Sequence, residues 1–207
     1  MYYQNLNFTC GPACLLSAIQ KFKNYKSVSI IDEIEIWKES NTVFMGEGHP
    51  GTCPYGLATA AMKRGLFTKV FVSDNYSFFA KSINDREKQI VITVAQNTMM
   101  NRAIQCGAVV VRKPVTFDVI VEQIKLGYMA ILLVTDEDGP HWILVDGKQN
   151  IDGLTDCALT IFDPWHRRGN NLMYRSEFEK SASWEGVSCA VFVQPFDSPD
   201  KHFPKQS

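Results

Sequence analysis

The spacing of apolar residues changes along this chain, and that change constrains the fold more than any other feature. In the first half, apolar residues recur every three to four positions, as on one face of a helix; Leu15, Ala18, Ile19 and Phe22 are an example. From residue 129 onward, short β-branched apolar runs alternate with turn residues. Helices followed by a series of strands predict an α+β fold, with N-terminal helices packed on a C-terminal antiparallel sheet.

The individual elements follow from the same patterns and from their end signals. Thr116 is a good N-cap for a helix that Gly127 would end, and Gly65 would end another. We expect helices over 13–22, 29–38, 54–64, 88–105 and 117–126, and strands over 67–72, 108–112, 129–135, 142–145, 159–162 and 187–194.

Length and charge narrow the class of protein. A chain of 207 residues suits one globular domain, which we place at 1–195, with a polar, proline-containing tail at 196–207. A net charge of -1 and the lack of a basic run argue against nucleic-acid or anionic-membrane partners. No apolar run reaches the roughly 18 to 20 residues of a membrane helix, and no signal peptide is readable. We therefore expect a cytoplasmic protein, or alternatively an exported effector or toxin without a readable signal; the oligomeric state stays open.

The cysteines do not form a disulfide or metal pattern. Six cysteines are spread through the chain without a Cys-x-x-Cys pair, so reduced and mostly buried thiols are expected. His49 and Cys53 are two potential ligands four positions apart, which is too few for a metal site. We expect no metal and no cofactor.

One cysteine stands where its thiol could be reactive. In "YYQNLNFTCGPAC", Cys10 lies at the start of the first predicted helix, where unpaired N–H groups and the helix dipole favour a thiolate. The Cys10 N–H and the side-chain amide of Gln4 could both donate to a developing oxyanion. Cys14, one turn later, is a rival nucleophile or a redox partner, although it has less access to the helix end.

A histidine and an aspartate can be paired by strand register. His141 begins an apolar run after a turn, and Asp163 ends the run "LTIFD". If Asp146 pairs with Ala158 in an antiparallel hairpin, Ile143 faces Ile161 and His141 faces Asp163. Asp163 would then orient His141, and a cysteine with an oriented histidine is an arrangement for acyl transfer.

These motifs resemble a known family. "QNLNFTCGPAC", "GPHWILVDG" and "TIFDPW" are similar to the papain-fold peptidases that remove double-glycine leaders from bacteriocins, and to their stand-alone bacterial relatives. His141 follows Cys10 by 131 positions, near the papain-type spacing of about 130 to 150. The resemblance implies a papain-like cysteine peptidase fold, with Gln4 as oxyanion donor, Cys10 as nucleophile, His141 as base and Asp163 as its orienter. No ATP-binding-cassette or membrane segment is present, so export coupled to leader removal is not implied.

Further residues are candidates for contact with a peptide or protein substrate. The loop "GEGHPGTCPYG" contains Gly48, His49 and Gly51, and its glycines would let backbone approach an extended peptide. Trp142 would shield the imidazole or pack in the sheet, and the segment 166–168, "HRR", could form a positive rim. We expect a cysteine peptidase acting on a peptide or isopeptide bond; the alternatives are a related amidase, deamidase or acyltransferase, a catalytically silent peptide-binding module, and a thiol-redox protein.

Overall fold

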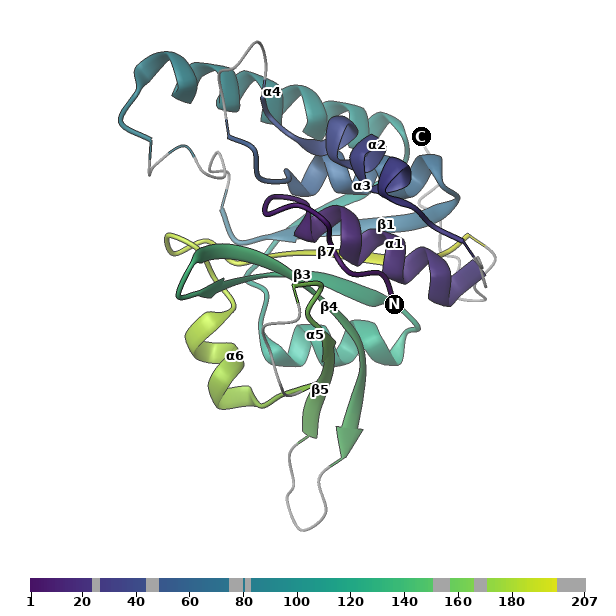
Figure 1. The fold of residues 1–207 in the computed structure, drawn as a ribbon. Coiled ribbons are helices and arrows are strands. Elements are labelled where there is room, and N and C mark those ends of the chain that lie inside the picture. The colour runs from purple at the N-terminus through teal and green to yellow at the C-terminus, as the bar shows by residue number, and fades with distance from the viewer. Residues whose placement is uncertain are drawn as a thin grey trace, which may run out of the picture.

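The computed structural model describes residues 1–23, 27–43, 49–74, 80, 83–150, 157–165 and 171–196 (Figure 1). These residues form an α+β structure of six helices and seven strands. In chain order they are α1 (Cys10–Lys23), α2 (Ile30–Ser40), α3 (Pro54–Lys63), β1 (Leu66–Val72), α4 (Arg86–Gln105), β2 (Val109–Arg112), α5 (Phe117–Lys125), β3 (Met129–Asp136), β4 (Gly139–Asn150), β5 (Cys157–Phe162), β6 (Leu172–Met173), α6 (Arg175–Ser181) and β7 (Cys189–Pro195).

Every helix expected from the sequence is present, with ends shifted by a few residues. Thr116 caps α5 as expected, because its side chain accepts a hydrogen bond from the Val119 N–H. Two short elements were not predicted, β6 and α6. Their lengths, two and seven residues, are too short to establish a period in the sequence.

All seven strands form one sheet in the order β2-β1-β7-β3-β4-β5-β6. Strands β1 and β2 pair in parallel, and each of the other neighbouring pairs is antiparallel. The expected antiparallel sheet of the second half is therefore only part of the sheet. β1 and β2 come from the helical half of the chain, and β1 joins the rest of the sheet through β7.

Helices cover both faces of the sheet (Figure 1). On one face, α1 and α3 pack against the strands. Helix α2 packs on α1 and α3, and α4 packs on α3. The core on this face includes Leu15, Leu57 and Trp142. On the other face, α5 and α6 cover a second core that includes Phe117, Ile120 and Phe178. The expected N-terminal helical layer is confirmed, and a second helical layer is added to it.

The predicted register between β4 and β5 is wrong. Leu144 pairs with Phe162 and Val145 with Ile161, and the register then shifts at a bulge between Val145 and Gly147. The carboxylate of Asp146, the bulged residue, lies 2.8 Å from Lys21 Nζ of α1. A bulge of this kind inserts a residue and redirects a side chain, and apolar alternation in the sequence does not reveal it.

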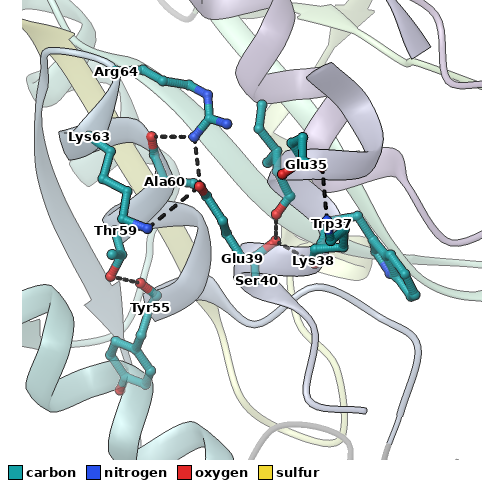
Figure 2. Close-up of polar contacts among 11 residues, drawn as sticks. Glu35, Trp37, Lys38, Glu39, Ser40, Tyr55, Thr59, Ala60, Lys63 and Arg64 are labelled. Atoms are coloured by element: carbon teal, nitrogen blue, oxygen red, sulfur yellow. Dashed lines mark hydrogen bonds and ion pairs between the residues drawn. The ribbon is translucent and has the colours of Figure 1, made fainter. Parts of the chain in front are cut away.

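Helices α2 and α3 are held together by a charged cluster near their C-terminal ends (Figure 2). Glu39 of α2 lies 2.7 Å from Arg64 Nη1 and 3.5 Å from Lys63 Nζ. Close backbone contact accompanies this cluster, because a Cβ on Gly56 would lie 2.4 Å from the Ser40 Cα.

None of the helices in the described residues combines the length and apolarity needed to cross a membrane.

Gly56→Ala should destabilise the fold. The added methyl would meet Ser40 backbone and push α2 away from α3, and overpacking of this kind costs about 1 to 3 kcal/mol. This exceeds the gain of about 1 kcal/mol in helix propensity. Urea denaturation should show a lower free energy of unfolding for Gly56→Ala. Gly147→Ala is the control, because its nearest neighbour atom would be 3.6 Å away; equal stability of the two variants would contradict the packing argument.

Candidate active site

Cys10 lies at the first residue of α1, as the sequence predicted. The Thr9 carbonyl accepts a hydrogen bond from the Ala13 N–H at 3.0 Å, which starts the helix immediately before Cys10. Cys10 is 8% exposed, so the residue is mostly shielded from water. One turn on, the Cys14 thiol donates to the Trp142 carbonyl at 3.4 Å, and this contact holds α1 against β4 beside His141.

His141 and Asp163 are in direct contact. His141 is the third residue of β4, and Asp163 directly follows the last residue of β5. His141 Nε2 and Asp163 Oδ1 are 2.8 Å apart, with both residues more than nine-tenths buried. Asp163 Oδ1 also accepts the Trp165 N–H at 2.9 Å, which fixes the carboxylate.

The contact forms although the predicted register is wrong. Continuing the observed register places Asp163 opposite Ile143, diagonally from His141. The predicted and observed pairings differ here by two residues, and a shift by two keeps the same side chains on the same face. A diagonal neighbour is within reach of a long or aromatic side chain.

Two neighbouring side chains, those of Asp163 and Cys10, raise the pKa of His141 against the effect of burial. Burial alone would lower its pKa, but hydrogen bonds to Asp163 and to the Cys10 side chain, with their charges, raise the pKa of His141 to about 10. Because Nε2 faces Asp163, Nδ1 is the ring nitrogen left for Cys10. The imidazole therefore lies between the Asp163 carboxylate and the Cys10 sulfur, and both favour its protonated form.

Gln4 lies beside the turn that carries Asp163. Its backbone N–H donates to the Pro164 carbonyl at 3.0 Å. Its side-chain Nε2 donates to the Leu6 carbonyl at 2.7 Å, and its Oε1 is buried with no hydrogen-bond partner among the described residues. An amide nitrogen carries two protons, so one N–H is held by Leu6 and the other can donate elsewhere.

The loop that begins at His49 lies against the start of α1. A Cβ on Gly11 would lie 3.1 Å from Thr52 Cβ, so the glycine after Cys10 allows this close approach. The Trp142 indole N–H donates to the Thr52 carbonyl at 3.2 Å. Thr52 therefore contacts both the residue after Cys10 and the residue after His141.

The residues expected to bind substrate have different environments. Gly51 donates its N–H to His49 Nδ1 at 2.8 Å, and burial lowers the pKa of His49, which favours its neutral form. Trp142 is only 2% exposed, so its side chain packs in the core and does not offer a surface to a substrate. Gly48 and the segment 166–168 lie outside the described residues.

A cavity of about 270 Å³ opens beside His141. Its lining was not predicted from the sequence, where the run before His141 was interpreted only as a turn. Strand β3 and the β3–β4 turn bring polar side chains to it. The lining residues are Asn7, Asp136, Asp138, Pro140, His141 and Trp165. Within the part of the chain that the structure describes, no three His, Cys, Asp or Glu side chains gather as a metal site would require.

Fold and site together define an α+β protein in which a cysteine at a helix N-terminus contacts a histidine held by a buried aspartate. Residues 1–177 match the Peptidase_C39 like family, and the chain belongs to this family. No curated protein and no solved structure matched the chain.

The pKa of His141 makes part of the stability depend on pH. Because this pKa is raised on folding, the stabilisation is complete below the unfolded value of about 6.5 and is lost as pH rises through about 10. In Asp163→Asn, burial should dominate and the pKa of His141 should fall. Urea denaturation at about pH 6 and about pH 10.5 should therefore show a stability difference between wild type and Asp163→Asn that shrinks at the higher pH. A difference that is constant with pH would contradict this assignment.

Proposed function

We propose that this protein is a papain-like cysteine peptidase, or a close acyl-transfer relative, that acts on a peptide or isopeptide bond. The contact of His141 with both Asp163 and Cys10 carries this proposal. Membership of the Peptidase_C39 like family supports it, as does the resemblance to double-glycine leader peptidases and their stand-alone relatives. Six unpaired cysteines suit a reducing compartment, so we place the activity in the cytoplasm.

The proposed reaction uses these side chains in sequence. The Cys10 thiolate attacks the carbonyl carbon, and the carbonyl oxygen becomes an oxyanion that accepts hydrogen bonds from the Cys10 N–H and the free N–H of Gln4 Nε2. Protonated His141 gives its proton to the leaving amine, and the C–N bond breaks. Neutral His141 then takes a proton from water as the water attacks the thioester, and the C–S bond breaks to release the acid and restore the Cys10 thiolate and protonated His141.

The role of Asp163 in this scheme is electrostatic. A buried imidazole without a partner would be neutral and could not protonate an amine at neutral pH. Asp163 stabilises the imidazolium and fixes the ring, because Nε2 is held at 2.8 Å. The aspartate therefore keeps the proton on His141 until the leaving group needs it.

The substrate is expected to reach the site along the surface between the 49–53 loop and the cavity beside His141. Thr52 borders Gly11 on one side of Cys10, and Trp165 lines the cavity next to His141. An extended peptide could lie along such a surface with its scissile carbonyl at Cys10. The glycine at position 51 is consistent with close approach of the peptide backbone.

Two other functions are less well supported. A redox pair of Cys10 and Cys14 is disfavoured because burial, together with the charges of Cys10 and Asp163, raises the pKa of Cys14 well above its usual value. A silent peptide-binding module would not require a histidine held between a carboxylate and a thiol. Measurements of thiol reactivity separate both from the peptidase.

Iodoacetamide should label Cys10 rapidly at about pH 6, where ordinary thiols are almost fully protonated. Cys106 is exposed and provides an internal reference for an ordinary thiol, while Cys14 is fully buried and should not react. Peptide mapping by mass spectrometry gives each rate. His141→Ala should slow the labelling of Cys10 and leave that of Cys106 unchanged. Labelling of Cys10 no faster than Cys106 would refute the ion-pair nucleophile, and a Cys10–Cys14 disulfide would favour redox chemistry.

Gln4→Ala should reduce turnover more than substrate binding. Loss of one oxyanion donor typically lowers kcat by about 10²- to 10³-fold, because the oxyanion exists only after attack. A peptide library first identifies a cleaved sequence, with Cys10→Ala as the inactive control. We expect kcat to fall for Gln4→Ala while KM changes little. An unchanged kcat would remove Gln4 from the oxyanion hole.

A further inference from the structure

A second buried carboxylate lies near the site, and the scheme above does not use it. Glu33 of α2 is fully buried. Its Oε1 accepts the backbone N–H of Asn5 at 2.9 Å and the hydroxyl of Thr9. Its Oε2 accepts the Tyr2 hydroxyl at 2.8 Å and the Asn5 side-chain amide at 2.6 Å. All four donors belong to the segment 2–9, which ends just before Cys10.

These hydrogen bonds account for the cost of burying the carboxylate. A carboxylate has about four acceptor positions, and four donor groups face them here; the Thr9 hydroxyl, which has one proton, also lies 2.9 Å from the Leu6 carbonyl oxygen. Among the described residues no Lys, Arg or His forms an ion pair with Glu33. Burial, and then the hydrogen bond and charge of Glu33, raise the pKa of Tyr2, so this hydroxyl remains a donor. Glu33 is thus satisfied only by the segment that it holds.

The same segment carries one proposed oxyanion donor, Gln4, and directly precedes the other, the N–H of Cys10. The Leu6 carbonyl accepts the Gln4 side-chain amide at 2.7 Å and the Thr9 N–H at 3.3 Å. Fixing Asn5 and Thr9 therefore fixes the carbonyl that orients Gln4. Thr9 also precedes the peptide bond whose N–H belongs to Cys10. A rotation of the Thr9–Cys10 peptide plane would move the Cys10 N–H, which is the second proposed oxyanion donor.

Helix α2 is a firm support for this arrangement. Its C-terminal end is anchored to α3 by Glu39, which contacts Arg64 and Lys63 (Figure 2). Its N-terminal end is closed by a capping box in which Ser29 and Asp32 take part. A carboxylate on such a helix can hold a loop that has no regular secondary structure of its own.

We propose that Glu33 is a positioning residue that preorganises the oxyanion hole through the segment 2–9. This proposal rests on the proposed acyl-transfer function of Cys10. Glu33 does not touch the reacting atoms; it holds Gln4 and the Thr9–Cys10 peptide where an oxyanion would form. Its loss should slow reactions of Cys10 that pass through an oxyanion and should spare reactions that do not.

Two reagents separate these cases without knowledge of the natural substrate. With p-nitrophenyl acetate, the Cys10 thiolate adds to the ester carbonyl, and the tetrahedral oxyanion collapses to S-acetyl-Cys10 and p-nitrophenolate. With iodoacetamide, the thiolate displaces iodide from carbon and no oxyanion forms. The first rate follows from the p-nitrophenolate burst after subtraction of the Cys10→Ala background, and the second from mapping of the alkylated Cys10.

Glu33→Gln keeps the side-chain shape but replaces one acceptor oxygen by a donor. We expect the acetylation rate of Cys10 to fall about 10- to 100-fold, somewhat less than for complete loss of an oxyanion donor, and the alkylation rate to stay unchanged. Glu35→Gln is the matched control on the same helix, because Glu35 is exposed and forms an ion pair with Lys38; both rates should stay at the wild-type value. Unchanged acetylation in Glu33→Gln, or a parallel fall of both rates, would overturn the proposal.

A milder pair of variants covers the case in which Glu33→Gln fails to fold. Thr9→Val removes one donor to Glu33 and should give the same selective loss of acetylation, though a smaller one. Thr59→Val is its control, because the Thr59 hydroxyl donates to the Tyr55 carbonyl within α3, away from Cys10. Equal ratios of acetylation to alkylation in both variants would count against Glu33. A wild-type Cys10 that reacts no faster than Cys106 would instead refute the proposed function itself.

Discussion

The contact between His141 and Asp163 is the interaction on which the candidate site depends. It joins two strand ends, β4 and β5, at the place where α1 begins. Burial of an imidazole favours its neutral form, and the carboxylate together with the Cys10 side chain reverses this preference. The raised pKa keeps the proton on His141 at neutral pH, although the imidazole is buried.

A second carboxylate supports the same helix end in a different way. Asp163 has a titratable partner, so the energy of its contact changes with pH. The four donors to Glu33 are amide and hydroxyl groups, and the Tyr2 hydroxyl is kept protonated by the raised pKa. The contact with Asp163 favours the protonated form of His141, and the hydrogen bonds to Glu33 hold the segment 2–9 in place. Cys10 lies where the two meet.

Much of the fold could be predicted from apolar spacing, because long amphipathic helices and β-branched strands leave a period in the sequence. Helices α1 to α5 were expected, and so was the strand-rich second half. The parallel pairing of β1 with β2 was not expected, although the helix α4 between these two strands is the connection typical of parallel pairing. Helix α6 was missed because seven residues span only two turns.

The contact between His141 and Asp163 was predicted, but not the strand pairing that produces it. Alternation specifies which face a side chain occupies but not which partner it meets, so the pairing of β4 with β5 was misplaced by two residues. His141 and Asp163 still meet, because a shift by two residues leaves both side chains on the same face of the sheet. Trp142 was expected to shield the imidazole or to pack in the sheet, and its side chain lies in the core.

Glu33 shows why the supporting residues could not be found in the sequence. In α2 it stands among alternating isoleucine and acidic residues, "IIDEIEIWKES", and looks like part of a solvated face. Its neighbours Asp32 and Glu35 do act that way, the one in a capping box and the other in an exposed ion pair. Only the fold reveals that one of these similar carboxylates turns inward and meets a segment about 28 residues earlier. A buried carboxylate without a cation needs several donors at once, and a loop beside a reactive cysteine is a place where such rigidity has a use.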